Sequence, residues 1–410
     1  MRIATLQFAP RLGDVEGNMR RADELLKLKR SAATTTATAK NDELSSVEDG
    51  PGPGIEELRP DILVLPEMAF TGYNFPSLQA IKPYLEPQGT GPTAKWARDT
   101  AKYLKCKVCV GYPEISKAEV RHGDGDEAPS PSETEKYFNS LLVVDENGEI
   151  LLNYRKQFLY YTDETWASEG DGGWGYHALE FDSPRPSQDN ATRQQVPTTF
   201  GICMDINPYR FEAPFTAWEF ANRVLDSQSQ LVIISTAWLT LEGQEAIASL
   251  GRNRPDMDTF NYWIRRFWPL IEKRMAHDGD IDGGSSLRSG MTQSEKKVVL
   301  VFANRTGVEE GTEGFNPTAT YAGTSTIIAI TQKLPPEKNG DGAAATGLKQ
   351  HDNEKPLDVK ILCWDMKGAT EEGICFADTL SEPKMVFGLV KRSDDGNGDG
   401  NGDDDDDGES

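Results

Sequence analysis

Three side chains that can take part in covalent chemistry follow three separate apolar segments of this 410-residue chain. They are Glu67, Lys156 and Cys203, and each comes within two residues of the end of a segment rich in β-forming residues. A thiol can attack a carbonyl carbon once a carboxylate takes its proton, and a fixed ammonium stabilises the oxyanion that forms. If the three side chains meet in the fold, they predict hydrolysis of a carbon–nitrogen bond through a cysteine thioester.

Each of the three residues has a more ordinary interpretation when it is taken alone. Glu67 could cap a turn, Lys156 could be a solvated cation, and Cys203 could be a small buried apolar side chain. The conjunction of all three, each after an apolar strand, favours the chemical role. Burial behind a strand raises the pKa of Glu67 toward that of a useful base. Gly201 predicts a sharp turn that places Cys203 at a helix entrance, which favours thiolate, and the Met204 N–H would join Lys156 in binding the oxyanion.

The elements that must position these residues follow from hydrophobic patterning. Short apolar segments predict strands at Ile3–Phe8, Asp61–Leu65, Lys107–Val110, Asn139–Val144, Glu149–Tyr154, Thr198–Ile202, Leu231–Ser235, Val298–Ala303, Thr324–Ile330 and Val359–Trp364. Several are apolar on both faces, as strands covered on both sides are. Helical patterns occur at Val15–Leu28, Thr93–Leu104, Phe211–Leu225 and Asp256–Arg274. The alternation predicts an α/β architecture with packed layers.

Polar stretches rich in Gly, Pro, Ser and Asp interrupt this pattern and have no apolar face of their own. They lie near residues 31–54, 116–135, 183–195, 276–295 and 335–355. Because none separates two self-sufficient sets of elements, they predict surface insertions in one domain spanning residues 1–392. In residues 393–410, nine acidic residues alternate with Gly and Asn, which predicts a disordered acidic tail.

The local sequences around the three reactive residues resemble those of one enzyme family. The motifs are Leu65-Pro66-Glu67, Tyr154-Arg155-Lys156 and Gly201-Ile202-Cys203-Met204-Asp205. In combination they resemble the nitrilase, or carbon–nitrogen hydrolase, superfamily, whose members are similar in carrying a Glu–Lys–Cys triad at matching strand ends. The resemblance implies a four-layer α-β-β-α sandwich and catalysis without metal or cofactor. It also implies that Glu164, eight residues after the lysine, is the second acid of the site.

Two longer stretches are similar to one subgroup, the fungal protein N-terminal amidases. They are residues 156–164, with the sequence KQFLYYTDE, and residues 202–215, with the sequence ICMDINPYRFEAPF. This resemblance implies removal of ammonia from an N-terminal Asn or Gln of a protein. The product, an N-terminal Asp or Glu, would feed an N-terminal degradation signal (N-degron).

A substrate with a free N-terminus needs a partner for its α-ammonium. Asp163 and Asp205 are candidates because they lie near the reactive residues in sequence, although a structural ion-pair role is favoured for both. Trp166 and Trp238 could wall the pocket, with core packing as the competing interpretation.

The composition of the chain limits the partners and the compartment that we expect for it. A net charge of −23 argues against a nucleic-acid surface, because such surfaces need clustered Lys and Arg. No apolar run approaches the roughly 20 residues of a membrane span. Five scattered cysteines do not form a disulfide framework and suit a reducing compartment, so we expect a cytoplasmic protein, with the nucleus as a further possibility. Either a monomer or a homodimer is compatible with the sequence.

Two other functions remain open at this level. A small-molecule amidase or nitrilase of the same superfamily would act on free amides or nitriles and ignore peptide termini. A catalytically silent scaffold would use the acidic tail and the loops to recruit partners, although the presence of all three triad residue types argues against it.

Overall fold

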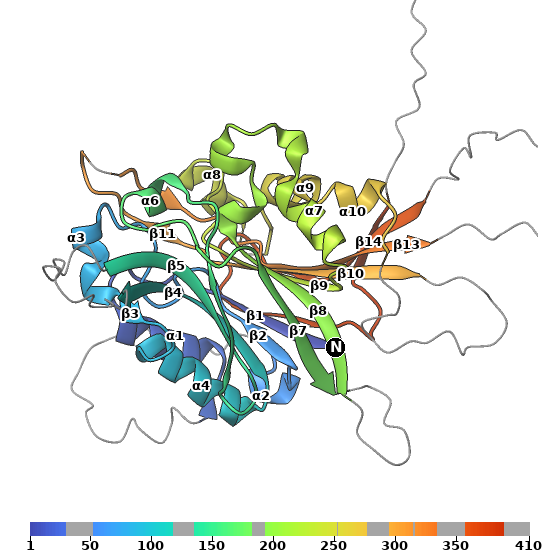
Figure 1. Ribbon diagram of the computed structural model, residues 1–410, viewed down its shortest axis with the longest axis horizontal. Helices are drawn as coiled ribbons and strands as arrows, with labels where there is room; N and C mark the ends of the chain where they lie inside the picture. The colour runs from blue at the N-terminus through green and yellow to red at the C-terminus, as the bar shows by residue number, and fades with distance from the viewer. Residues whose placement is uncertain are drawn as a thin grey trace, which may run out of the picture.

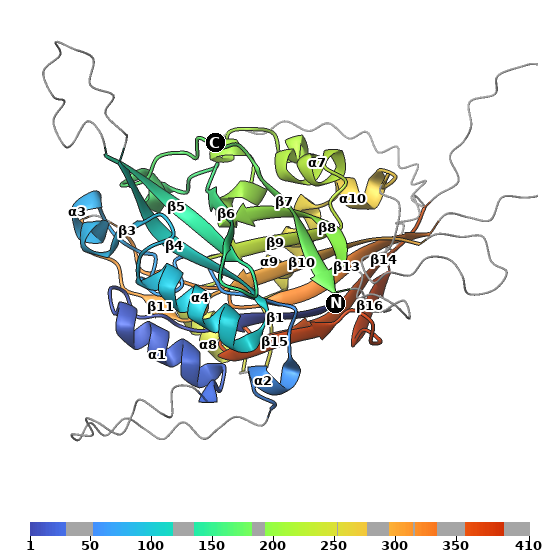
Figure 2. The same ribbon diagram turned by 60° about the horizontal axis from the view of Figure 1, so that its bottom comes forward.

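Two β-sheets lie face to face in the computed structural model, and helices cover the outer face of each (Figures 1 and 2). The structure describes residues 1–29, 52–117, 135–182, 193–251, 253–276, 295–314, 316–333 and 357–388. Over these residues the four layers confirm the predicted α-β-β-α sandwich. The five polar stretches predicted as insertions lie almost entirely outside the described residues, and the predicted acidic tail lies wholly outside them.

The first sheet carries the predicted strands of the N-terminal part of the chain. In the described residues its strands are β1 (Arg2–Gln7), β2 (Ile62–Val64), β3 (Glu86–Pro87), β4 (Lys107–Lys117), β5 (Glu135–Val144), β6 (Ile150–Arg155) and β15 (Gly373–Asp378). The order is β15-β1-β2-β4-β5-β6, with β3 paired to β4. β1, β2 and β4 are parallel, whereas β4–β5 and β5–β6 are antiparallel. Two reversals make β6 point the same way as β2, so the residues that follow these strands lie at the same end of the sheet.

The second sheet holds the strands from the middle and the C-terminal part. Its described strands are β7 (Gly175–Asp182), β8 (Arg193–Ile202), β9 (Leu231–Thr236), β10 (Lys296–Asn304), β13 (Thr326–Lys333), β14 (Asp358–Met366) and β16 (Met385–Gly388). Their order is β16-β14-β13-β10-β9-β8-β7, with β8, β9 and β10 parallel. A separate hairpin pairs β11 (Val308–Glu309) with β12 (Ala319–Thr320). The sequence did not predict β7, β15 or β16, which lie at or near the sheet edges.

Helices pack on the two outer faces. On the first sheet α1 (Val15–Leu25) and α4 (Pro92–Leu104) are the main ones, with the short helices α2 (Ile55–Leu58), α3 (Leu78–Ile81) and η2 (Lys82–Tyr84) nearby. The second sheet is covered by α7 (Glu219–Asp226), α9 (Met257–Arg266) and α10 (Pro269–Glu272), followed outward by α8 (Gln244–Ser249). Asp14 and Asp256 cap α1 and α9 by accepting backbone N–H groups of the first turn. Within the described ranges, no helix has the length and apolar character that a bilayer crossing requires.

Two predicted helices are interrupted in the structure. In the segment 211–225 the helix begins only at residue 219, because Pro214 and the left-handed Trp218 (φ 41°) precede it. The short 3-10 helices η4 (Tyr209–Phe211) and η5 (Phe215–Ala217) occupy the start of the segment instead. The segment 256–274 divides at Pro269 into α9 and α10. The apolar periodicity identified the buried faces, whereas proline decided where the helices stop.

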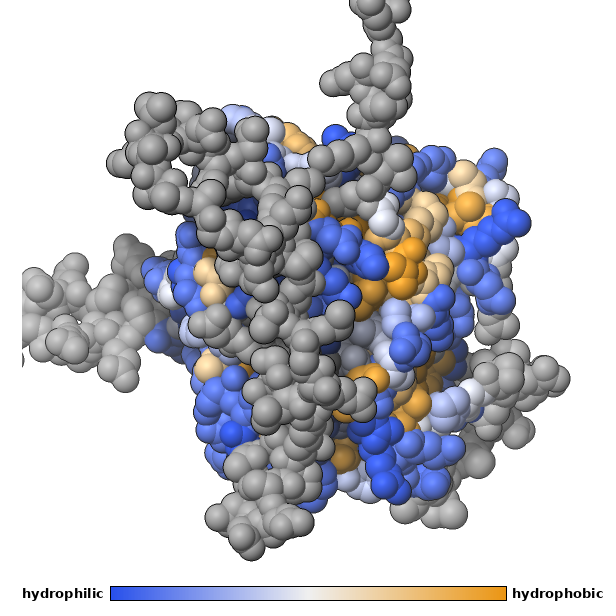
Figure 3. Space-filling model, turned by 90° about the vertical axis from the view of Figure 1, so that its right-hand side faces the viewer, coloured by the Kyte–Doolittle hydropathy of each residue, from blue (hydrophilic) through white to orange (hydrophobic). Residues whose placement is uncertain are grey.

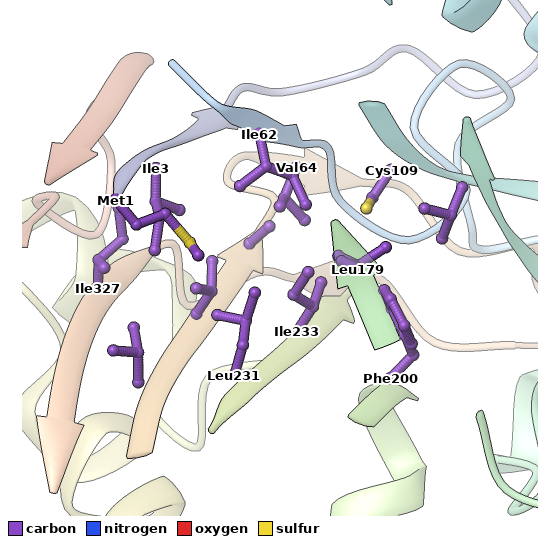
Figure 4. Close-up of a cluster of buried hydrophobic side chains, with 14 of the residues drawn as sticks. Met1, Ile3, Ile62, Val64, Cys109, Leu179, Phe200, Leu231, Ile233 and Ile327 are labelled. Atoms are coloured by element: carbon purple, nitrogen blue, oxygen red, sulfur yellow. The ribbon is translucent and has the colours of Figure 1, made fainter. Parts of the chain in front are cut away.

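The interior contains three layers of apolar contact. Between the sheets, side chains such as Ile3, Val64 and Ile233 interdigitate from opposite sides (Figure 4). A second cluster lies between the first sheet and α1 and α4, and a third lies between the second sheet and α7, α9 and α10. Each fully buried aliphatic side chain contributes about 1.5–3 kcal/mol to the transfer term. On the side where β13 ends and β10 and β14 begin, the surface is mainly hydrophilic with some hydrophobic patches (Figure 3). The layers are therefore fixed by apolar burial, which holds the strand ends rigidly.

Candidate active site

Glu67 lies in a tight exit from β2, pressed against the neighbouring strand β4. A Cβ atom on Gly111 of β4 would lie 2.7 Å from the Glu67 Cα, so only glycine allows this approach. The Glu67 side chain is fully buried. Its Oε1 accepts hydrogen bonds from Lys156 Nζ and Asn139 Nδ2, both at 2.6 Å, and its Oε2 accepts one from the Ala237 N–H at 2.7 Å. Burial raises the pKa of Glu67 although the Lys156 ammonium lowers it, in the predicted direction.

Lys156 follows β6 and lies between two buried carboxylates. Its Nζ is 2.6 Å from Glu67 Oε1 and 2.6 Å from Asp163 Oδ2, and all three side chains have no exposed surface. Burial by itself would lower the pKa of Lys156, but the two carboxylates outweigh it and raise that pKa, so the amine stays charged. An ammonium has three N–H donors, and these two contacts leave one for a further acceptor. The solvated strand-end cation is thereby excluded.

Cys203 is held in a strained turn at the end of β8. Its φ is 43°, in the left-handed region that non-glycine residues rarely adopt, and it begins the 3-10 helix η3 (Cys203–Ile206). The sharp exit is as predicted. Cys203 is 9% exposed, whereas Glu67 and Lys156 are fully enclosed, so the thiol residue is the one that reaches the surface.

The ionisation of Cys203 differs from the prediction. Burial and the nearby Glu67 carboxylate raise its thiol pKa well above the usual value, more than Lys156 and the Ala237 N–H lower it. The backbone N–H groups at the start of a single 3-10 turn do not lower the pKa of the thiol as much as the loss of solvent raises it. The thiol is therefore neutral at rest and must give its proton to a base. Glu67 and Lys156 are thus near enough to Cys203 to shift the pKa of its thiol in opposite directions.

Asp163, and not the predicted Glu164, is the acid beside Glu67 that contacts Lys156 in the structure. Both lie on the single-turn helix α6 (Tyr161–Glu164), where neighbouring residues point in different directions. Asp163 is buried and its Oδ2 accepts hydrogen bonds from Lys156 Nζ, from Tyr73 Oη at 3.1 Å and from the Tyr160 N–H at 3.0 Å. Glu164 is exposed. Because Asp163 is occupied by these donors, it is an ion-pair partner of Lys156 rather than a binder of the substrate ammonium.

Asp205 likewise has a structural role. Its Oδ1 accepts the backbone N–H groups of Gln157 and Phe158, and its Oδ2 accepts the Tyr154 hydroxyl and the Ile202 N–H. Burial raises its pKa to about 6 in spite of these donors. Asp205 thus fastens the segment after β6 to the turn after β8, and no oxygen remains for an ammonium ligand. These contacts fit the structural interpretation of Asp205 rather than a substrate contact.

The two tryptophans differ in their surroundings. Trp166 is buried in an apolar cluster with Tyr73 and Ala237, beside the site, and its indole N–H has no hydrogen-bond partner among the described residues. Trp238 is half-buried and packs its ring 5.6 Å from that of Tyr262. Core packing accounts for Trp166, and the partly buried Trp238 stays the candidate for a pocket wall.

Three contributors to the site were missed at the sequence level. Asn139 binds Glu67 from β5, the Ala237 N–H binds it from the end of β9, and the Tyr73 ring lies 5.6 Å from the Lys156 ammonium. A polar residue at the start of the apolar segment 139–144 was the available signal for Asn139. A backbone donor such as Ala237 leaves no signal in residue type.

Comparison with known proteins agrees with this geometry. The family model described as carbon-nitrogen hydrolase matches residues 2–181. Curated relatives named protein N-terminal amidase are similar over most of the chain. The Saccharomyces cerevisiae protein is 26% identical over 83% of this chain and 88% of its own, and the Schizosaccharomyces pombe protein is 28% identical over 81% and 92%.

Solved structures support the fold. A crystal structure of N-terminal amidase superimposes with a TM-score of 0.60 at 22% identity, covering 95% of this chain and 99% of that one. The same fold is seen in crystal structures of N-terminal amidase with a Gln-Gly peptide and with an Asn-Glu peptide, both with a TM-score of 0.60. The carbon-nitrogen hydrolase model therefore matches the N-terminal part of the chain, residues 2–181, and the fold is similar to that of the N-terminal amidase structures.

Proposed function

We propose that this enzyme hydrolyses the side-chain amide of Asn or Gln at the N-terminus of a protein or peptide. The products are ammonia and an N-terminal Asp or Glu, which would act in an N-terminal degradation signal. The observation that carries the proposal is the buried contact of Glu67 with Lys156 beside the strained turn of Cys203. The likeness to protein N-terminal amidases over about four-fifths of the chain supports the substrate.

The first half-reaction starts from a neutral thiol. Glu67 takes the proton of Cys203 while the sulfur attacks the amide carbonyl carbon. The oxyanion that forms is bound by the free N–H of the Lys156 ammonium and by the backbone N–H of Met204. Glu67 then gives its proton to the nitrogen, the carbon–nitrogen bond breaks, and ammonia leaves. The acyl group remains on Cys203 as a thioester.

The second half-reaction uses the same groups with water. Glu67 takes a proton from water as the oxygen attacks the thioester carbon, and Lys156 again stabilises the oxyanion. The carbon–sulfur bond breaks, and the proton held by Glu67 returns to the sulfur. The net change is amide plus water to carboxylic acid plus ammonia, with Cys203 and Glu67 restored. Asp163 keeps Lys156 charged and in place throughout.

An aromatic surface beside Cys203 offers contacts to the residues that follow the first one. Burial raises the pKa of Tyr160, and the nearby Cys203 raises it further. Its ring contacts those of Tyr161 and Phe211, at centroid distances of 5.0 and 6.3 Å. Tyr161 is 61% exposed and Phe211 is 44% exposed, so this surface runs from the site to solvent. A peptide substrate can lie on it, whereas a free amide would leave it bare.

Mass spectrometry of model peptides tests the proposal. The enzyme should convert amide to acid in peptides that begin with Asn or Gln, and should leave internal Asn unchanged. Cys203→Ala should abolish the conversion, while Cys375→Ala, which alters another buried free cysteine, should retain it. Faster hydrolysis of free asparagine or glutamine than of peptides would favour a small-molecule amidase. If no amide tested releases ammonia, the silent scaffold is favoured.

A further inference from the structure

Asn139 occupies a central place in the site that no part of the reaction explains. It lies on β5 and is fully buried. Its Nδ2 donates to Glu67 Oε1 at 2.6 Å and to Asp163 Oδ1 at 3.0 Å. Its backbone carbonyl accepts the Lys156 N–H at 2.9 Å, which ties the β5 and β6 segments together. One asparagine therefore contacts the base, the oxyanion-binding residue and the acid behind it.

The four side chains form a closed ring of hydrogen bonds. Lys156 and Asn139 each donate to both Glu67 and Asp163. The ring contains two carboxylates and a single cation, so the neutral amide supplies donors without adding charge. Both donors to Glu67 use Oε1, which leaves Oε2 for the Ala237 N–H, the same N–H that lies near the Cys203 sulfur.

The orientation of the Asn139 amide follows from its neighbours. A flipped amide would turn its carbonyl oxygen toward two carboxylates, and acceptors repel one another. In the observed orientation Oδ1 has no hydrogen-bond partner among the described residues. The hydrogen bonds that hold the Asn139 side chain in this orientation are thus those of its NH2 group to Glu67 and Asp163.

From this ring we propose that Asn139 is a positioning residue for the hydrolysis. Its amide fixes the rotation of the Glu67 carboxylate, so that one oxygen stays with Lys156 and the other faces the thiol. It also keeps two like-charged carboxylates apart at a fixed distance. The inference depends on the proposed function only in that Glu67 is the base for Cys203.

Another asparagine in the same sheet provides a control that distinguishes a positioning role from a contribution to core stability. Asn153 on β6 donates its Nδ2 to Glu114 Oε2 at 2.7 Å, within a partly buried polar network. Asn153→Leu therefore removes this bond and the one that Asn153 Oδ1 accepts from Tyr112 Oη at 2.7 Å, without touching the reactive residues. Asn139→Leu keeps a similar volume and removes both bonds of the ring.

Two readouts test the proposal on the full chain. The first is the pH profile of Cys203 alkylation by iodoacetamide, which needs no substrate. The Asn139 hydrogen bond lowers the pKa of Glu67, so its loss should move the acidic limb of the Asn139→Leu profile to higher pH. The second is ammonia release from an Asn peptide, where we expect a fall of about 100-fold in kcat/KM from misplacement of the base.

The outcomes are distinct for each hypothesis. Asn153→Leu should leave the alkylation limb and the turnover close to wild type. Asn139→Asp replaces the donor by an acceptor and should move the limb in the same direction as Asn139→Leu. An unmoved limb in folded Asn139→Leu, or equal effects of Asn139→Leu and Asn153→Leu, overturns the proposal. If wild type is alkylated at Cys203 but turns over no N-terminal amide, the proposed function fails. The comparison of the acidic limbs of the alkylation profiles of wild type and Asn139→Leu still decides the positioning inference.

Discussion

Replacing Lys156 by methionine removes the cation between Glu67 and Asp163 while keeping most of the side-chain volume. Both carboxylates are fully buried and each lies 2.6 Å from Nζ in the native protein. Methionine can neither pair with them nor donate to an oxyanion. The substitution therefore tests two statements together: that the ammonium stabilises the fold at this point, and that it lowers the barrier of the reaction.

The two effects have separate magnitudes. Removing one partner of a buried ion pair costs about 3–5 kcal/mol of unfolding free energy, because the other charge stays buried without compensation. Loss of an oxyanion donor lowers kcat by about 100- to 1000-fold, equivalent to about 2.7–4 kcal/mol. Because Glu67 Oε1 accepts a hydrogen bond from Lys156, the substitution also misplaces Glu67, which lowers activity further. Lys156→Met should therefore be nearly inactive even under conditions where it is folded.

The stability loss should depend on pH in a defined direction. Burial already raises the pKa of Glu67 in the presence of Lys156, and removing the ammonium should raise that pKa further. A carboxyl whose folded pKa exceeds its unfolded value binds more protons in the native state, so stability falls as pH rises through that interval. At the acidic end of this interval Glu67 binds a proton, so Lys156→Met loses less stability there than at the alkaline end, where the full cost applies.

Urea unfolding at both pH values, together with ammonia release from an Asn peptide, measures these quantities. Lys107→Met is the matched control, since Lys107 is a buried lysine of the same sheet whose partner, Glu146, is 3.0 Å away and partly exposed. The control should retain activity, and its stability loss should lack the increase toward alkaline pH. Activity of Lys156→Met within about tenfold of wild type would refute the oxyanion role. An equal stability loss at both pH values would refute the account of the buried charges.

Two further substitutions test how the site is positioned. Asp163→Asn should lower kcat/KM by about 100-fold because Lys156 loses a charged partner. Glu164→Gln, on the exposed side of the same turn, should change kcat/KM by less than about twofold. If steady-state kinetics show that Glu164→Gln is the more damaging substitution, Glu164 is the second acid after all. Gly111→Ala should destabilise the protein by about 1–3 kcal/mol and lower activity, because the added Cβ would meet the Glu67 backbone. Gly172 has open space around it, so Gly172→Ala should match wild type in the same thermal and kinetic assays.

The central strands of both sheets were predictable because strands buried on both faces consist of continuous apolar residues. The segment 231–235 is apolar on both faces, and the structure buries every residue of the corresponding strand β9. Edge strands such as β16 are largely exposed, so their residues carry no comparable apolar signal. Helix ends were less predictable, because apolar periodicity continues through Pro214 and Pro269 although the backbone cannot.

Within the site, the choice between neighbouring acids could not be made from the sequence. Spacing from Lys156, together with family resemblance, selected Glu164, but the structure turns Asp163 inward. On a single helical turn, successive side chains diverge by about 100°. Which of the two faces Lys156 is set by how α6 packs against Tyr73 and the strands beneath it. No property of either carboxylate contains that information.

The sequence by itself predicted the layered α/β class and singled out Glu67, Lys156 and Cys203 by their conjunction, because apolar strands and reactive residue types are local properties of the chain. Tertiary structure alone decided that β2, β6 and β8 end beside one another and that Asn139 and the Ala237 N–H complete the surroundings of Glu67. It also decided the protonation state of the thiol. The physical reason is that desolvation and charge–charge contact depend on distances through space, which the order of residues does not specify.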